Sequence, residues 1–287
     1  MSLKCLITGG GGMLGRDIRS VFPESVALTH DELDITDEYA VLDAARNKDL
    51  LINCAAYTQV DAAESNAAKA YAVNEAGARA VAKAAARRSI RVVHISTDYV
   101  FSGTAIRPYP EDHPHSPISV YGRSKAAGEK AVLEEYSEGS FIIRTAWLYG
   151  QYGNNFVKSI LKACRTRDIV TVVNDQYGQP TWSLDLAKQI KLLAESDAPC
   201  GVYHGTNSGK TTWFDFAGKV AALGGYDPKR IIPISSAQFV RPARRPGYSC
   251  LGHDAWTAVG LEPMRPWEDA LNDAWAAGVF AECIAGQ

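Results

Sequence analysis

A run of glycines near the N-terminus constrains this chain more than any other feature. The segment TGGGGMLG at residues 8–15 lies between a short apolar run, Cys5–Thr8, and a helix-like stretch that begins near Met13. Glycine lets a backbone turn tightly and approach a pyrophosphate, and a following helix directs its amides and positive dipole at that phosphate. The spacings GxGxxG, from Gly10, and GxxGxxG, from Gly9, both fit. We predict a dinucleotide-binding turn; a merely flexible turn is the alternative.

Short apolar runs alternate with Ala-rich amphipathic stretches through the first half of the chain. The apolar runs are residues 5–8, 26–28, 50–53, 92–95 and 141–143. Such near-continuous apolar runs are typical of strands buried on both faces. The longest stretch between them, residues 67–88, predicts a helix of several turns. The alternation therefore predicts an α/β fold with a doubly wound parallel sheet of the Rossmann kind.

After about Gly150 the pattern changes, because Gly, Pro and Trp become frequent and the strand and helix signals weaken. We predict a dinucleotide-binding Rossmann domain over residues 1–150. Residues 151–287 are expected to form mainly a smaller α/β domain that binds the substrate. No low-complexity linker separates the two, so we expect an interleaved boundary, with segments of the second part returning to the first domain.

Composition excludes several classes of protein. The chain has 30 Lys plus Arg against 32 Asp plus Glu, so its formal charge of −2 gives no case for nucleic acid or an acidic membrane surface. No apolar run approaches the roughly 20 residues that span a bilayer, and the first residues do not resemble a signal peptide. The six cysteines are scattered without the spacing of a zinc site. We expect reduced thiols in a cytoplasmic protein.

A tyrosine and a lysine four residues apart, Tyr121 and Lys125, share a face if they lie on a helix. A lysine cation, joined by the positive nicotinamide ring, would lower the pKa of the tyrosine and make it a workable acid–base group. A surface Tyr–Lys pair is the alternative. The pair follows a Pro-rich loop and the segment Ser96-Thr97-Asp98, which ends a predicted strand where ligands of open α/β sheets bind. Thr97 is thus placed to bond the same substrate oxygen as Tyr121.

A carboxylate about 20 residues after the glycine turn is the second half of a dinucleotide fingerprint, since it bonds the adenosine ribose. Asp31, Glu32 and Asp34 lie in that neighbourhood, and each can equally be a solvated loop carboxylate. Arg16 and His30 are the nearby groups that could meet a 2′-phosphate. The residues leave the cofactor as NADPH or NADH, with a slight preference for NADPH.

Together these motifs resemble the extended short-chain dehydrogenase/reductases, and within them the family of dTDP-4-dehydrorhamnose reductases. The similar segments cover most of the chain: residues 8–15, 32–37, 53–64, 96–101, 121–125, 144–150, 153–157, 175–181 and 245–246. The resemblance implies transfer of a hydride from NADPH or NADH to the C4 keto group of dTDP-4-dehydro-L-rhamnose, giving dTDP-L-rhamnose. The implied partner is thus a dTDP-sugar, in the synthesis of nucleotide sugars for cell-wall polysaccharide.

The resemblance also implies roles for single residues. Those implied to contact the dinucleotide are Gly9, Gly12, Met13, Leu14, Gly15, Arg16, Asp34, Ile35, Ala55, Ala56, Tyr57, Tyr121 and Lys125. Thr97, Tyr121 and Lys125 form the catalytic set, with Lys125 on the nicotinamide ribose. The residues implied to face the substrate are Val60, Thr97, Trp147, Asn155 and Arg245. Core packing is the alternative for Val60 and Trp147, and a solvated basic loop is the alternative for Arg245 and its neighbours Arg241 and Arg244.

Two departures from the family pattern matter. His30 stands where the family often has arginine, which leaves the preference for NADP open, and Gly252 stands where an acid is usual after a Ser-x-Leu segment. Some members dimerise around Mg²⁺ on surface carboxylates. No positions here are matched to that site, so we predict no metal and leave a homodimer as an open alternative.

Three other functions compete with this interpretation. A reductase for a different nucleotide-linked 4-keto-6-deoxysugar would need the same residues. A sugar-nucleotide 4,6-dehydratase is disfavoured, since Thr97-Asp98 is followed by Tyr99 where those enzymes have glutamate. A non-catalytic NAD(P)-binding subunit, such as the regulatory partner of methionine adenosyltransferase, shares the resemblance, but the intact Thr97, Tyr121 and Lys125 favour an enzyme.

Overall fold

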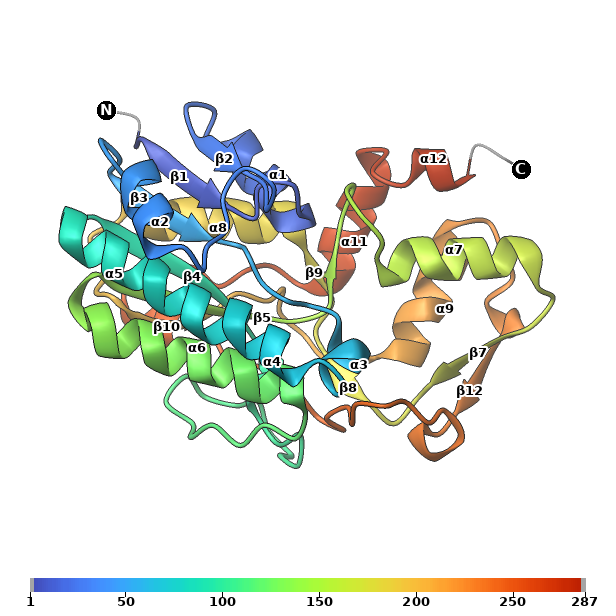
Figure 1. Cartoon of the computed structure of the whole chain (residues 1–287). Helices are drawn as coiled ribbons and strands as arrows, with labels where there is room; N and C mark the ends of the chain where they lie inside the picture. Colours follow the sequence, from blue (N-terminus) through green and yellow to red (C-terminus); the bar gives the residue numbers. More distant parts are fainter. Residues whose placement is uncertain (1–2, 285–287) are drawn as a thin grey trace.

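One parallel sheet organises the larger part of the chain in a computed structural model that describes residues 3–284 (Figure 1). Its six strands lie in the order β10-β5-β4-β3-β1-β2, and all neighbours are parallel. The strands are β1 Cys5–Thr8, β2 Val26–Leu28, β3 Leu50–Asn53, β4 Arg91–Thr97, β5 Ser140–Thr145 and β10 Gly201–His204. The strand order reverses between β1 and β3, the kind of switch point at which open α/β sheets bind ligands. The predicted doubly wound sheet is confirmed.

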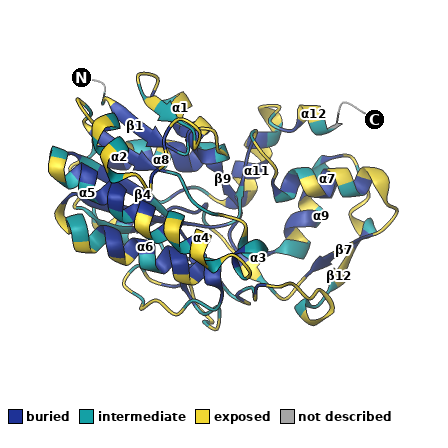
Figure 2. Cartoon of the chain, in the orientation of Figure 1, coloured by how far each residue is buried: buried dark blue, intermediate teal, exposed yellow. Residues whose placement is uncertain are grey.

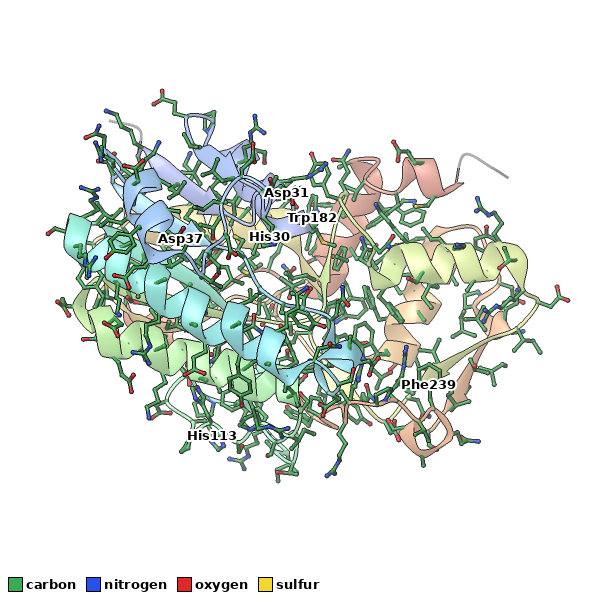
Figure 3. All side chains as sticks on the ribbon, viewed as in Figure 1. His30, Asp31, Asp37, His113, Trp182 and Phe239 are labelled. Atoms are coloured by element: carbon green, nitrogen blue, oxygen red, sulfur yellow. The ribbon has the colours of Figure 1, made fainter. Side chains whose placement is uncertain are left out.

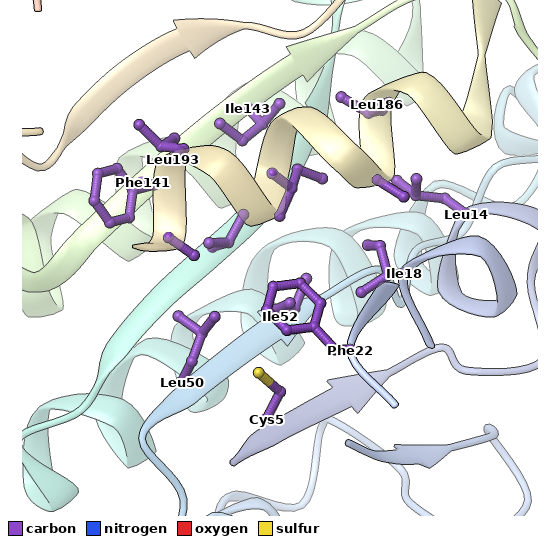
Figure 4. Packing of buried hydrophobic residues seen from close by; sticks show 14 of the residues in the cluster. Cys5, Leu14, Ile18, Phe22, Leu50, Ile52, Phe141, Ile143, Leu186 and Leu193 are labelled. Carbon is purple, nitrogen blue, oxygen red and sulfur yellow. The ribbon is translucent and has the colours of Figure 1, made fainter. Parts of the chain in front are cut away.

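Helices cover both faces of this sheet because its side chains alternate between them. Cys5 and Ile7 point to the face covered by α1 and α8, and Leu6 points to the face covered by α2, α5 and α6. Figure 4 shows Leu14 and Ile18 of the first group packed against the strands. The bounds are α1 Met13–Val21, α2 Glu38–Ala44, α5 Ala78–Arg88, α6 Val120–Tyr136 and α8 Ser183–Glu195. Within residues 3–284, no helix is both long and apolar enough to span a bilayer.

A smaller unit with its own buried core lies beside the sheet (Figure 2). Its main elements are α7 Phe156–Thr166, β7 Val170–Val173, α9 Trp213–Leu223, β12 Ile231–Ile234, α11 Trp267–Ala276 and α12 Ala281–Ile284. Phe216 of α9 is fully buried at its centre. The remaining short helices and strands are α3 Val60–Ala63, α4 Ala67–Tyr71, β6 Leu148–Tyr149, β8 Tyr177–Gly178, β9 Thr181–Trp182, β11 Thr211–Thr212 and α10 Asp254–Ala258.

The chain passes between the two units more than once. After β9 it returns to the sheet as α8 and β10, and later again as α10, whose Trp256 is buried in the core under the sheet. A boundary at residue 150 therefore describes only the first crossing, and the division into residues 1–150 and 151–287 stays a prediction.

The stretch predicted as one helix, residues 67–88, contains a π-helical turn, η1, at Ala72–Gly77 between α4 and α5. Asn74 lies in this turn and is buried. Its Oδ1 accepts from the Tyr57 amide at 2.8 Å, and its Nδ2 donates to the Tyr57 carbonyl at 3.1 Å. Single π turns inside helices often mark functional sites. Here the turn directs an amide side chain at the segment that follows β3.

Gly128 of α6 is where this arrangement is most sensitive to substitution. A Cβ at Gly128 would lie 2.0 Å from the Asn74 carbonyl oxygen, so α6 would have to move away from η1. We expect Gly128→Ala to lower the free energy of unfolding by about 1–3 kcal/mol in denaturant titrations. Gly218→Ala in α9 is the matched control, since a Cβ there meets nothing within 4 Å. An unchanged midpoint for Gly128→Ala would contradict the close packing of α6.

Candidate active site

The glycine turn links β1 to α1 and packs against the end of β3. A Cβ at Gly9 would lie 2.7 Å from the Ala55 nitrogen, and one at Gly15 would lie 2.5 Å from the Gly9 carbonyl oxygen. Gly9 has a φ of +67°, which favours glycine. Gly12 caps α1 without a side-chain hydrogen bond, and the first turn carries no acid. The amides at this helix start are therefore open to an anion, as a dinucleotide pyrophosphate requires.

Two of the three candidate acids after β2, Glu32 and Asp34, are already engaged by their own loop. Asp34 Oδ1 accepts from the amide of Thr36 at 2.9 Å and from its hydroxyl at 2.8 Å. Glu32 Oε2 accepts in the same way from Thr29, at 2.8 Å for both bonds. These hydrogen bonds lower the pKa of both carboxyls, so both stay ionised. His30, labelled in Figure 3, is exposed on the same segment.

The other residues that the resemblance implies to contact the dinucleotide differ in how far their side chains are buried. Arg16 donates from Nε to the Gly11 carbonyl at 3.1 Å, and its guanidinium lies 5.2 Å from the Tyr152 ring centroid. The side chains of Leu14 and Ile35 belong to the hydrophobic cores, which leaves only their backbone for a ligand.

Thr97, Tyr121 and Lys125 come together at the carboxyl end of β4. Thr97 is the last residue of this strand, and Ser119 caps α6 by accepting from the Gly122 amide at 3.1 Å. That cap starts the helix just before Tyr121, so Tyr121 and Lys125 lie one turn apart on it. Burial raises the pKa of Tyr121 to about 12, and a hydrogen bond with Thr97 opposes the shift. From the sequence we expected Lys125 to lower the pKa of Tyr121. In the protein without a dinucleotide this pKa is raised instead, and Lys125 is not among the causes of the shift.

Lys125 is held below Tyr121 and is only 2% exposed. Its Nζ donates to the Ile95 carbonyl at 2.6 Å. Burial lowers the pKa of Lys125 to about 8, against the opposing charges of Glu129 and Cys54. A lysine of this kind can hold a ligand hydroxyl and can also change its charge near neutral pH.

The Thr97 hydroxyl is engaged by its neighbour in the protein alone. It donates to Asp98 Oδ1 at 3.0 Å and accepts from the Tyr99 amide at 3.2 Å. Asp98 is buried, and burial raises its pKa to about 6 while the Thr97 bond opposes the shift. Thr97 must turn its proton away from Asp98 before it can donate to a substrate oxygen.

A cavity of about 840 Å³ opens between this site and the smaller unit. Tyr99 lines it and meets the Tyr121 ring edge-on at 5.7 Å between centroids, so the cavity lies beside the catalytic set, whose three residues are not part of its wall. Its wall combines aliphatic side chains with aromatic and basic ones, among them Phe156, Trp213, Phe239, Arg241, Arg244 and Arg245. Phe239 lies on the smaller unit in Figure 3. A cavity with flat rings and arginines suits a ligand that has an aromatic base and phosphate groups.

Arg245 reaches this cavity but is paired with Asp61 of α3. Its Nη1 and Nη2 donate to the two carboxyl oxygens of Asp61 at 2.5 and 3.0 Å, and Arg241 adds a contact at 3.4 Å. Burial would raise the pKa of Asp61, but these hydrogen bonds outweigh it and lower the pKa. The pairing bridges the two units, and a phosphate group would compete with Asp61 for the same guanidinium.

Trp147 and Asn155 have structural contacts of their own. Trp147 has a φ of +47°, and its ring stacks on Trp213 at 3.5 Å between centroids. Its other side lies on Gly178, where a Cβ would be 2.4 Å from the indole. Asn155 is buried and caps α7 by accepting from the Lys158 amide at 3.1 Å. Their substrate contacts, and that of the half-buried Val60, therefore stay predictions.

A buried ionic network lies beneath the Pro-rich loop that precedes α6. Glu129 is fully buried and accepts from Arg144 Nη2 at 2.8 Å, while its Oε2 lies 2.9 Å from His115 Nε2. The Ser96 hydroxyl, next to Thr97, donates to the same carboxylate. Burial acts to raise the pKa of Glu129, but His115 and Arg144 outweigh it and hold the pKa far below its usual range.

Removal of the charge on Glu129 should therefore be costly. We expect Glu129→Gln to lower the free energy of unfolding by about 3 kcal/mol or more, since Arg144 stays buried without its counter-charge. Because the folded pKa is depressed, the contribution of Glu129 is present above its unfolded pKa of about 4.3 and is lost as pH falls. Urea titrations at neutral and acid pH measure both effects. Glu134→Gln, in a surface pair with Arg79, is the control and should barely change stability.

Several site residues were not found from the sequence. Asn74 lies in a stretch that indicates only a helix, and Trp213 lies in the half where patterns are weak. Asp61 stands inside the segment quoted for the resemblance, but its arginine partners are about 180 positions away. Pairings between such distant residues leave no local signal.

Comparison with known proteins gives one family over nearly the whole chain. Residues 3–279 match the family described as RmlD substrate binding domain. A dTDP-4-keto-6-deoxy-D-glucose reductase of Streptomyces niveus is 46% identical over 282 residues, which cover 96% of this chain and 97% of that protein. A dTDP-4-dehydrorhamnose reductase of Streptomyces griseus is 45% identical over 284 residues, or 96% of this chain and 93% of that protein.

Solved structures agree with this result. The crystal structure of dTDP-4-dehydrorhamnose reductase from Bacillus anthracis in complex with NADP superposes with a TM-score of 0.92 at 37% identity. The match covers 96% of this chain and all of that one, 100%. The arrangement of sheet, glycine turn and smaller unit is therefore shared with a protein that binds this dinucleotide.

Proposed function

The chain belongs to the RmlD substrate-binding-domain family, and on that premise we propose that it is an NAD(P)H-dependent reductase of the C4 keto group of dTDP-4-dehydro-L-rhamnose. The product is dTDP-L-rhamnose. The observation that carries the proposal is the convergence of Thr97, Tyr121 and Lys125 at the carboxyl end of β4, beside the cavity.

The dinucleotide fits the glycine turn, since the amides at the start of α1 are uncapped and the backbone of Ala55 leaves no room for side chains in the turn. When bound, it supplies the hydride. Lys125 is the group placed to hold its nicotinamide ribose. Ala56 and Tyr57 would line the same side, and Asn74 of the π turn holds the backbone of Tyr57 in place.

Thr97 and Tyr121 act on the substrate oxygen in this mechanism. The two hydroxyls lie within hydrogen-bonding reach of each other, next to Tyr99 of the cavity wall, and together they would orient a carbonyl oxygen. A phenol with a pKa of about 12 stays protonated at neutral pH, so Tyr121 has a proton to give as the oxygen gains negative charge. Lys125 supports that transfer with its nearby positive charge.

The nucleotide part of the substrate is assigned to the cavity between the two units. Arg245, with Arg241, would bind the diphosphate bidentately after release from Asp61. Phe156 and Trp213 offer flat apolar surface to the base. The wall around Tyr99 then faces the sugar.

A different 4-keto-6-deoxysugar is the second candidate substrate. The Streptomyces niveus relative carries the name of a dTDP-4-keto-6-deoxy-D-glucose reductase at 46% identity. The catalytic set would serve either sugar, because Thr97 and Tyr121 contact only the C4 oxygen of the sugar and Lys125 contacts the dinucleotide. The two candidates are separated by comparing kcat/KM for the two keto sugars with the same enzyme.

The cell compartment and the assembly are part of the proposal as well. All six cysteines are free thiols, three of them buried and three half-buried, which suits a cytoplasmic enzyme. A homodimer stays an open alternative.

Tyr121→Phe tests the proton donor. We expect kcat to fall by roughly 10²- to 10⁴-fold, because general acid catalysis is removed while the ring and the fold remain. Consumption of NADPH measures kcat, and quenching of protein fluorescence measures the unchanged affinity for NADPH. Tyr136→Phe, at the far end of the same helix, is the control. Activity of Tyr121→Phe like that of the wild type would sink the assignment.

Arg245→Gln tests the diphosphate contact. Loss of a charge-assisted pair should raise KM for the dTDP-sugar about tenfold or more, with a smaller change in kcat. Arg123→Gln, on the exposed face of α6, is the matched control. Equal KM values for the Arg245 variant and the wild type would remove Arg245 from the substrate site.

A further inference from the structure

Lys125 also contacts His94, a buried histidine of β4. The imidazole of His94 is 1% exposed in the middle of β4, and its Nε2 lies 3.5 Å from Lys125 Nζ. The reaction proposed above has no use for this histidine. Because His94 contacts Lys125 and is buried without being part of the cavity wall, it is a positioning residue and not a catalytic one.

The hydrogen bonds of the Asn53 side chain determine which ring nitrogen of His94 carries the hydrogen. Asn53 Oδ1 accepts from the Ala55 amide at 3.2 Å and from the Thr8 hydroxyl at 2.7 Å. A backbone amide can only donate, so the oxygen of the Asn53 side chain must be on this side. Its Nδ2 then faces His94 Nδ1, at 3.0 Å. Since Nδ2 is a donor, Nδ1 must accept, which leaves the hydrogen on Nε2.

This N–H is directed at Lys125. An ammonium has only donors and cannot accept it, whereas the lone pair of a neutral amine can. We propose that Asn53 fixes His94 as the neutral tautomer with hydrogen on Nε2, and that this N–H favours the uncharged amine of Lys125.

Other charged groups near His94 and Lys125 do not favour the uncharged amine of Lys125. Glu129 on α6 and Cys54 after β3 face Lys125, and negative charge on either one favours the ammonium. Glu129 is already compensated by Arg144. Burial and the charge of Lys125 lower the pKa of His94 well below its usual value, so the imidazole stays neutral. The lowered pKa of Lys125, about 8, agrees with an environment that favours the amine.

The role that we give to the His94–Lys125 contact rests on the proposed reductase function. After Tyr121 has given its proton to the substrate oxygen, the phenolate needs one back. A lysine that gains and loses a proton near neutral pH can pass its proton toward Tyr121 and take another from water. A lysine with an ordinary pKa of about 10.4 would release it less readily.

The tautomer is tested directly by nitrogen NMR on protein with ¹⁵N-labelled histidine, without substrate or turnover. We expect His94 to show hydrogen on Nε2 and none on Nδ1 throughout the neutral pH range, with its signals assigned by their loss in His94→Gln. His204 is an internal contrast, because its Nδ1 faces the Gly252 carbonyl at 2.8 Å and must carry the hydrogen. Hydrogen on Nδ1 of His94, or a charged His94, would overturn the proposal whatever the enzyme reduces.

Asn53→Asp tests the effect on Lys125. The carboxylate keeps the bonds to Ala55 and Thr8 but accepts from Nδ1, which turns the His94 lone pair toward Lys125, as the buried Asp of a Ser-His-Asp triad fixes its histidine. We expect the titration of Lys125, followed by ¹³C NMR of labelled lysine with Lys125→Met as the assignment, to move up by about one pH unit or more.

The Asn53→Asp substitution also adds a negative charge, and the effect of that charge alone is measured by making the same substitution in a His94→Phe background. The shift there should be smaller, because no imidazole can turn its lone pair toward Lys125. His94→Gln, which keeps an acceptor for Asn53 and an N–H for Lys125, should titrate like the wild type. Equal shifts with and without the imidazole would contradict the proposal.

Discussion

The close packing of α6 against two backbone carbonyls sets the geometry on which the site depends. At Gly122 a Cβ would lie 2.2 Å from the Tyr99 carbonyl oxygen, and at Gly128 it would lie 2.0 Å from that of Asn74. These two contacts fix the height and rotation of the helix over β4. Tyr121 and Lys125 lie close to them on the same helix, so their positions follow from backbone contacts and not from side-chain flexibility.

Below the helix, buried polar side chains form a layer in which Glu129, Arg144 and Lys125 are each paired or hydrogen-bonded. Glu129 is balanced by Arg144, and Lys125 is held by the Ile95 carbonyl. Burial of charge is costly unless it is compensated, so this layer restricts the packing of α6 to one arrangement. The protein thereby keeps a compensated ion pair and a lysine with a labile proton one turn apart on the same buried face of the helix.

Local sequence signals were enough to predict the parallel sheet and the glycine turn. Apolar runs such as Leu50–Asn53 predict strands because burial on both faces demands them, and the glycine turn follows from the close approach of Gly9 to Ala55. The Tyr121–Lys125 spacing indicated the chemistry. What local patterns could not predict are contacts between distant residues: the π turn at Asn74, the pairing of Asp61 with Arg245, and the burial that raises the pKa of Tyr121. Each depends on tertiary neighbours that no local pattern records.

The proposed reaction moves a hydride from the dinucleotide to C4 of dTDP-4-dehydro-L-rhamnose and a proton from Tyr121 to its oxygen. The most direct measurement uses NADPH that carries deuterium at the transferred position, with product analysis by NMR. We expect dTDP-L-rhamnose with deuterium at C4 of the sugar. Folded protein that binds NADPH but leaves this sugar unlabelled, while it labels another 4-keto sugar or none, would contradict the proposed reaction.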